Sequence, residues 1–250
     1  TTVLCAVFSI PAGDRAANTR PVPHVGGPEM RTLYLEPFRK ARAEAGARGV
    51  MSSANDYSGE PITGSRRFLT DILRREWGFK GYVVSDSEAL EFLYTKHHVA
   101  ASYEDACALA VNAGLNVRTQ FTQPSEFITP LRQAVTSGKI SRETLDERVG
   151  EVLRVKFWLG LFDQPYRGDA ARVDRIVHSE PHRQLALDAA RQSMVLLKND
   201  SATLPLSAQM KRVAVIGPNA DARPISRYGP AGADVVSVVD GVRQLLPQAE

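Results

Sequence analysis

Short apolar runs alternate with longer amphipathic stretches along most of the chain. The apolar runs at 3–10, 49–53, 81–85 and 114–117 predict four strands. Their residues are apolar almost without interruption, which is typical of parallel strands covered on both faces.

Between these runs, apolar side chains recur at helical spacing and predict helices over 30–45, around 68–73, and over 103–113 and 125–136. Pro37 must kink or interrupt the first of these helices. Ser141 is placed to cap a further long helix that carries Leu145, Val149, Val152 and Phe157. Strands that alternate with helices over short connections predict a parallel sheet with right-handed crossovers.

The pattern changes after residue 162. Residues 163–174 are rich in Pro, Gly and charged side chains, which predicts a linker that we extend to 163–180. A helix over about 181–197 and a strand over 212–216 then open a second α/β domain, which occupies 181–250. The first domain is accordingly expected to occupy 1–162.

Composition narrows the function classes. The 31 basic and 28 acidic residues are interspersed, so no nucleic-acid partner is expected. No apolar run approaches the roughly 20 residues that span a bilayer, so no membrane partner is expected. Residues 1–11 lack the basic flank and cleavage site of a signal peptide, so the compartment is not decided, and a periplasmic or secreted location stays open. Cys5 and Cys107 match no metal-binding spacing and indicate no disulfide framework.

The main candidate for chemistry is Asp86, which directly follows the apolar run YVVS. A carboxylate at the carboxyl end of a parallel strand opens toward the mouth of a barrel, where such folds keep their active sites. The alternative is structural, because Ser85-Asp86-Ser87-Glu88 would also serve well as the N-cap of the next helix.

The amino-acid sequence around Asp86 resembles that of the family 3 glycoside hydrolases. The shared motifs are LTDILR at 69–74, EWGFKG at 76–81 and VVSD at 83–86. The resemblance extends to SIP at 9–11, LYLEPFR at 33–39, NAGLNVRT at 112–119, LRVKFWLGLFDQPY at 153–166, AARQSMVLLKND at 189–200 and VAVIGPNA at 213–220. It implies an α/β fold: the later half of a (β/α)8 TIM-type barrel, followed by the start of an α/β sandwich domain. By position, Asp86 would be the nucleophile that forms a glycosyl-enzyme ester.

Several positions depart from the family pattern. The family has a Lys-His pair that binds sugar hydroxyls and a Tyr near the nucleophile. This chain has Val3 and Leu4 in place of the pair and Ala54 in place of the Tyr. The family also has a Gly-Arg-Asp run, of which this chain keeps only the arginine, Arg15. Arg15 is therefore a candidate substrate-binding residue. The resemblance places the acid/base carboxylate beyond Glu250. Glu88 and Glu91 are possible substitutes, although both also suit a solvated helix face.

Four further residues are expected at the mouth of the barrel as substrate contacts: Arg118, Thr119, His97 and His98. A structural salt bridge is an equal alternative for Arg118, and a partly buried loop pair is the alternative for the two histidines.

The resemblance implies hydrolysis of terminal non-reducing β-D-glucosyl residues by retaining double displacement, on an oligosaccharide or β-glycoside substrate. A β-xylosidase of the same family is one alternative, and a catalytically impaired carbohydrate-binding or structural remnant is the other. No cofactor and no metal are implied. Four barrel strands cannot close on themselves, so we expect either a homo-oligomer or a part of a longer protein.

Overall fold

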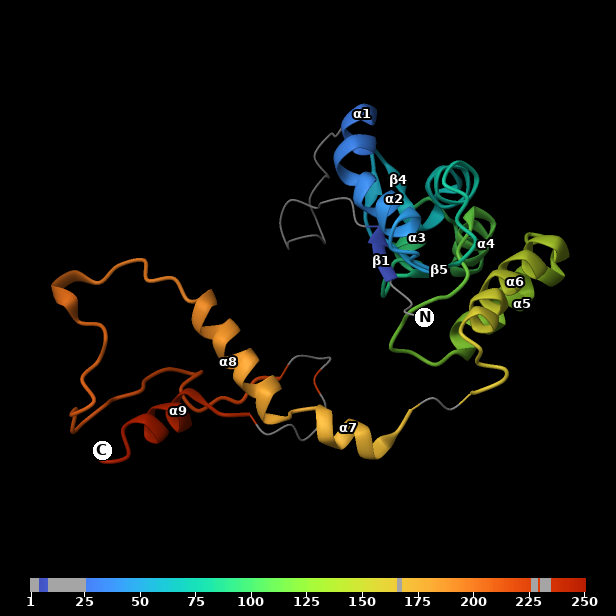
Figure 1. The fold of residues 1–250 in the computed structure, drawn as a ribbon. Coiled ribbons are helices and arrows are strands. Elements are labelled where there is room, and N and C mark those ends of the chain that lie inside the picture. Colours follow the sequence, from blue (N-terminus) through green and yellow to red (C-terminus); the bar gives the residue numbers. More distant parts are fainter. Residues whose placement is uncertain (1–4, 9–25, 166–167, 226–228, 230–234) are drawn as a thin grey trace. The chain divides into compact units, whose positions relative to one another are not determined.

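The computed structural model describes residues 5–8, 26–165, 168–225, 229 and 235–250 (Figure 1). The chain divides into two compact units, Thr1–Gly168 and Asp169–Glu250, which we describe separately. The domain limits expected from the sequence stay a prediction.

The centre of the first unit is a three-stranded parallel sheet of β1 (Cys5–Phe8), β2 (Gly49–Ser52) and β5 (Tyr82–Ser85). The strand order follows the chain order, and Phe8, Ser52 and Ser85 are aligned at the carboxyl ends. Consecutive parallel neighbours are the arrangement of a singly wound barrel, whereas a doubly wound sheet reverses its order at a switch point.

The strand expected at 114–117 is reduced to one isolated bridge, in which Val117 pairs in parallel with Val84. The Asn116 side chain explains this correction. Its Oδ1 accepts the Val83 backbone N–H at 2.7 Å, so a side chain occupies a position that a backbone carbonyl would take in a regular ladder. The chain still follows the edge of β5 there, because the backbone N–H groups of Asn116 and Val117 both donate to the Val83 carbonyl.

The helix expected at 30–45 is interrupted as predicted. It is divided into α1 (Gly27–Glu29), the π-helical η1 (Met30–Tyr34) and α2 (Glu36–Ala43). Pro37 lies in the first turn of α2, where its missing N–H has no intrahelical acceptor to lose.

Most of the remaining helices of this unit lie close to their expected positions. The expected ones are η3 (Arg67–Glu76), α4 (Tyr103–Ala113), α5 (Ser125–Thr136) and α6 (Arg142–Trp158). Two short helices were not expected from the sequence, η2 (Ile62–Gly64) and α3 (Phe92–Thr95). A short hairpin of β3 (Asp56–Tyr57) and β4 (Glu60–Pro61) precedes η2. The Ser141 hydroxyl caps α6 by accepting the Thr144 N–H, which confirms the prediction from the sequence.

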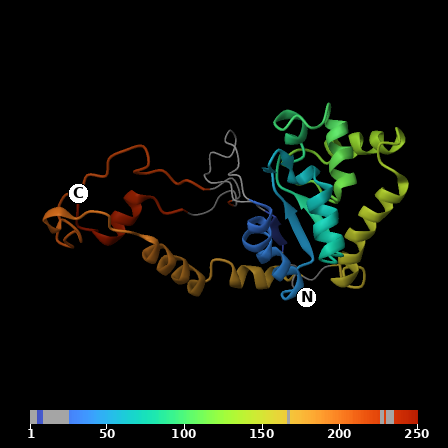
Figure 2. The ribbon, with the colours of Figure 1, turned by 90° about the horizontal axis from the view of Figure 1, so that it is seen from above.

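The helices of the first unit pack around the strands and bury one main core (Figure 2). This core joins Val50 and Val83 of the sheet to residues of η3 and α4, among them Phe68, Leu73 and Ala110. Burial of apolar side chains contributes about 25 cal/mol per Å², so this cluster stabilises the frame that holds the sheet ends in place.

The second unit contains α7 (Ala170–Ile176), α8 (Glu180–Ser193), η4 (Asp200–Ala202) and α9 (Val238–Leu245). The α7 helix lies within the expected linker. The helix expected to reach residue 197 ends at Ser193, because Met194 adopts an extended conformation.

The strand expected at 212–216 is not formed among the described residues. Val213 and Lys211 bond only to the backbone of Glu250, and Ile216 is 91% exposed. A strand covered on both faces needs neighbouring strands and apolar layers. Within the described part of the unit, this segment has no neighbouring strand, and Val213 and Val215 share a pocket with apolar residues of α9 on one side only.

Candidate active site

The fold places Asp86 directly after β5, at the carboxyl end of the parallel sheet. Its backbone N–H donates to the Ser52 carbonyl at 3.2 Å, so the chain still pairs with the end of β2 at this point. The residue is partly buried. Asp86 therefore lies at the end of the sheet where parallel-barrel enzymes hold their reacting groups.

The contacts of Asp86 do not match the structural alternative of a helix cap. Asp86 Oδ1 accepts the N–H of the adjacent Ser87 at 2.8 Å. The next helix, α3, begins only at Phe92, and its N-cap residue is Glu91, without a side-chain cap. The intervening turn includes Glu88 at φ 64°. A non-glycine residue in this left-handed region is uncommon and is often found where a functional turn is held in a fixed shape.

Buried hydroxyl groups form a polar layer under this edge. The Thr63 hydroxyl donates to the Ser53 carbonyl at 2.9 Å, so the Ser52 hydroxyl, 2.8 Å away, must donate to Thr63. On the other side, the Ser85 hydroxyl accepts the Thr119 N–H at 3.0 Å. These bonds fix the strand ends on both sides of Asp86, and residue-by-residue reading of the sequence missed Ser52 and Thr63. The only signal for them was that the apolar runs end in serine.

Arg118 lies after the Val117 bridge and is held by Glu91. Its Nη2 lies 2.5 Å and its Nε 3.0 Å from Glu91 Oε1, and Nη2 also donates to the Thr122 hydroxyl at 3.0 Å. Only 5% of the Arg118 side chain is exposed. Of the two interpretations left open, the structure thus shows the salt bridge, and substrate contact by Arg118 stays a prediction.

The ion pair of Arg118 and Glu91 lies beside the partly buried side chain of Tyr103 and the buried side chain of Cys107. The Arg118 guanidinium lies 5.9 Å from the Tyr103 ring centroid, and the Tyr103 hydroxyl donates to Glu91 Oε1 at 3.4 Å. Burial raises the pKa of Tyr103 above its ordinary value, and burial also raises the pKa of the Cys107 thiol to about 12. Neither group is therefore a nucleophile or base near neutral pH.

The two histidines are placed differently. His97 is largely buried, and its Nε2 lies 3.1 Å from the Ala54 carbonyl, which can only accept, so Nε2 carries the proton. Its Nδ1 lies 4.0 Å from Asp56 Oδ1. His97 thus joins the loops that follow β2 and β5. His98 is exposed, at φ 52°, and bonds to the Tyr94 carbonyl.

Thr119 is exposed, and its backbone is anchored by the bond to Ser85. Its side chain lies at the same end of the sheet as Asp86. Arg15, Val3 and Leu4 lie outside the described residues, so their expected roles have no structural counterpart.

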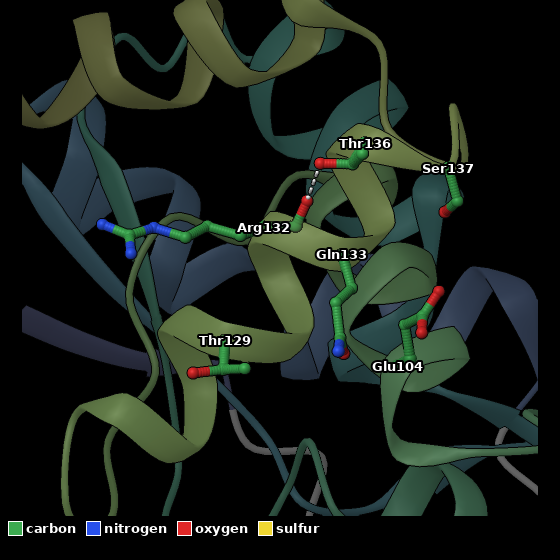
Figure 3. A pocket seen from close by; sticks show the side chains of 6 residues that line it. All are labelled: Glu104, Thr129, Arg132, Gln133, Thr136 and Ser137. Atoms are coloured by element: carbon green, nitrogen blue, oxygen red, sulfur yellow. Dashed lines mark hydrogen bonds between the residues drawn. The ribbon is translucent and has the colours of Figure 1, made fainter.

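A separate pocket lies on α4 and α5, lined by Glu104, Thr129, Arg132, Gln133, Thr136 and Ser137 (Figure 3). The Arg132 side chain extends away from Glu104, and the Thr136 hydroxyl donates a hydrogen bond to the Arg132 carbonyl. No charged groups converge in this pocket among the residues that line it.

None of the helices in the described ranges is long and apolar enough to span a membrane. The described residues also hold no group of three or more His, Cys, Asp or Glu side chains suited to a metal ion.

Comparison with known proteins identifies the family. Residues 12–155 match the glycosyl hydrolase family 3 N terminal domain, and residues 194–249 match the glycosyl hydrolase family 3 C-terminal domain. The chain belongs to glycosyl hydrolase family 3. This family of glycoside hydrolases is the one indicated by the motifs around Asp86, so that resemblance is confirmed.

Related family 3 sequences carry two kinds of name. A periplasmic beta-glucosidase of Salmonella typhimurium is 40% identical over an alignment of 212 positions, which covers 79% of this chain and 27% of that protein. A beta-xylosidase of Formosa agariphila is 34% identical over an alignment of 229 positions, which covers 86% of this chain and 31% of that protein. The chain therefore spans less than a third of the length of these relatives.

Solved family 3 structures share the fold. A β-glucosidase from Erythrobacter marinus matches with a TM-score of 0.73 and 34% identity, over 90% of this chain and 29% of that one. A beta-glucosidase from Listeria innocua in complex with glucose matches with a TM-score of 0.69 and 32% identity, over 90% of this chain and 31% of that one. These likenesses support a TIM-type barrel as the fold of the N-terminal family domain.

Proposed function

We propose that this chain belongs to an enzyme that hydrolyses terminal non-reducing β-D-glucosyl residues by retaining double displacement, with Asp86 as the nucleophile. The observation that carries the proposal is the position of Asp86. It lies at the carboxyl end of β5, it is partly buried, and it is not used as a helix cap. The substrate is an oligosaccharide or another β-glycoside.

In this mechanism a carboxylate oxygen of Asp86 attacks the anomeric carbon, and the leaving oxygen departs with a proton from a second carboxyl group. Water then cleaves the glycosyl ester, and the second group acts as the base. Retaining enzymes hold the two carboxyl groups about 5–5.5 Å apart.

Neither nearby glutamate suits the acid role well. Glu91 is engaged by Arg118, and Glu88 is exposed on the turn. We propose that the acid/base residue belongs to a part of the family's second domain outside the matched residues 194–249.

Around the nucleophile, we propose that Thr119 and His97 contribute to sugar binding. Thr119 is exposed beside the anchored strand end, and His97 joins the two loops that follow β2 and β5. Arg118 supports the site by holding Glu91, with direct substrate contact as its second proposed role. His98 stays a candidate substrate contact because it follows the strand that ends at Asp86, and Arg15 stays one because the family pattern has an arginine there.

At the level of fold, we propose that β1, β2, β5 and the 114–117 segment are four consecutive strands from the later half of a (β/α)8 barrel. Their order along the sheet, which follows the chain, supports this arrangement. Residues 181–250 would begin the α/β sandwich domain.

β-Xyloside hydrolysis is the second candidate, because relatives of comparable similarity carry beta-xylosidase names. The two substrates differ by one hydroxymethyl group, so their discrimination depends on subsite residues. Val3, Leu4 and Ala54, in place of hydrogen-bonding residues, favour an impaired form of either enzyme. Hydrogen bonds that strengthen in the transition state supply several kcal/mol in these enzymes.

The test is hydrolysis of dinitrophenyl β-glucoside and β-xyloside, whose leaving groups need little protonation. We expect slow cleavage with glucoside preferred, and cellobiose cleaved far less well. Asp86→Asn should lower kcat/KM by about 10³-fold or more, because the nucleophile acts in the chemical step. Asp71→Asn, which removes a carboxylate from the exposed face of η3, should change it less than about twofold. Activity that is undiminished in Asp86→Asn would place the chemistry elsewhere.

A further inference from the structure

A second polar pocket lies at the opposite end of the sheet from Asp86. It is formed where the chain enters β2 and β5, and its side-chain lining includes Arg42, Arg48, Lys80, Phe79 and Trp158. All of these residues belong to the first unit, so the pocket does not depend on how the two units are placed.

The charges in this pocket are of one sign. Three cations line it, and no carboxylate is among the lining residues. Within the described chain, neither Arg42 nor Arg48 nor Lys80 forms an ion pair. Arg42 uses one N–H to bond the Gly78 carbonyl at 2.9 Å, which leaves its other donors for a ligand.

Arg48 is held in place by stacking on an aromatic side chain. Its Cζ lies 4.2 Å from the Trp158 ring centroid, so it is stacked on the aromatic face. Its Nε is buried and has no acceptor among the described residues. A buried donor without an acceptor costs free energy, and such groups are commonly satisfied by a bound molecule or ion.

Backbone packing keeps Arg48 close to the entrance of β5. The Arg48 carbonyl accepts the Tyr82 N–H at 3.2 Å. A Cβ at Gly81 would lie 2.0 Å from the Arg48 carbonyl oxygen, so only glycine permits this approach. The pocket therefore has a fixed wall on the side of Arg48.

We propose that this pocket binds a compact oxyanion, in the form of a phosphate group or the carboxylate of an acidic sugar. A stacked guanidinium presents a planar set of donors that matches either anion in a bidentate manner. Arg42 and Lys80 supply the remaining positive charge. This site is separate from the proposed catalytic end and does not rest on glycoside hydrolysis.

The test is isothermal titration calorimetry of the full chain with sodium phosphate and, separately, with sodium glucuronate, at constant ionic strength against a chloride blank. We expect saturable binding of at least one anion. Phosphate as the tighter ligand would identify an inorganic or phosphoryl ligand, whereas glucuronate as the tighter ligand would identify an acidic sugar. Arg48→Gln should weaken binding about tenfold, because charge-assisted hydrogen bonds are lost.

Two further variants keep the test decisive. Arg132→Gln removes the same charge from an exposed position on α5 and should leave affinity within about twofold. Lys80→Gln changes an exposed side chain that the fold does not need, and should weaken binding about threefold even if Arg48→Gln does not fold. The proposal is overturned if neither anion binds the wild-type chain more than chloride does. Binding that is equally tight in the wild type, Lys80→Gln and any folded Arg48→Gln would also overturn it.

Discussion

The two units of the chain differ most in how much apolar surface they bury. In Thr1–Gly168, side chains such as Phe68, Leu69 and Leu73 are fully buried in one cluster. In Asp169–Glu250, Leu197, Ile216 and Leu245 are 92%, 91% and 82% exposed. Ser237 is the sole buried residue among those whose burial is described in that unit.

This difference shows which structures form from local interactions and which need distant partners. The helix α9 forms because Ser237 and Asp240 make a capping box at its start. The apolar segments at 194–197 and 213–216 have no such local support, and they stay without strand partners in the described chain. Exposed apolar surface of this kind favours association. The self-association expected from four barrel strands that cannot close on themselves stays a prediction, which sedimentation of the purified chain checks.

The ion pairs show the same contrast. Arg74 and Glu151 are 8% and 7% exposed, and their bond joins η3 to α6. Glu151 also accepts from Asn116 and pairs with Arg148, which makes a buried network. The pair of Arg191 and Asp188 on α8 is 63% and 46% exposed. Breaking a buried pair leaves a charge without compensation, whereas exposed pairs contribute little.

The largest expected effect is at the core of the first unit. Phe68→Ala should lower the free energy of unfolding by about 4 kcal/mol, because it leaves a cavity in a fully packed cluster. Leu185→Ala on α8, where the side chain is 68% exposed, should change it by less than about 0.5 kcal/mol. Urea unfolding followed by circular dichroism measures both. Similar losses for the two variants would remove the distinction between the units.

A somewhat smaller effect is expected at the buried network. Glu151→Gln should lower the free energy of unfolding by about 3 kcal/mol, because Arg74 loses its counterion and Arg148 keeps only its pair with the exposed Glu147. Asp188→Asn should lower it by less than about 1 kcal/mol. The same urea measurement decides the matter, and a loss below about 1 kcal/mol for Glu151→Gln would show that the network is replaceable.

The smallest effect concerns two serines in equivalent positions. Ser141 caps α6 through its hydroxyl, whereas Ser179 precedes α8 and makes no side-chain cap bond. Ser141→Ala should therefore cost about 1 kcal/mol of stability. Ser179→Ala should cost only a few tenths of a kcal/mol. Thermal unfolding of both variants tests this pair, and the prediction is contradicted if Ser179→Ala is the more destabilising change.

Elements defined by local sequence could be predicted well. The helices at 103–113 and 125–136 and the cap at Ser141 follow from periodicity and capping, which act within one turn. The strand at 114–117 could not be predicted correctly, because Asn116 bonds to a residue 33 positions away. The pairing of Arg118 with Glu91 also joins distant positions, so the sequence left its role open between substrate contact and salt bridge. Asp86 could be proposed as the nucleophile because a whole motif, rather than a single residue, marked its place after a strand.

The most direct test of the account is trapping of the glycosyl-enzyme ester on Asp86. Dinitrophenyl 2-deoxy-2-fluoro-β-glucoside suits this chain because its leaving group needs no acid catalyst, so the acid/base residue is not required for the first step. Mass spectrometry of a peptic digest should show the fluoroglucosyl group on the peptide that contains Asp86, and no label on the Asp86→Ala variant. Labelling of another carboxylate such as Glu91, or no labelling of the wild-type chain, would contradict the assignment of Asp86 as the nucleophile.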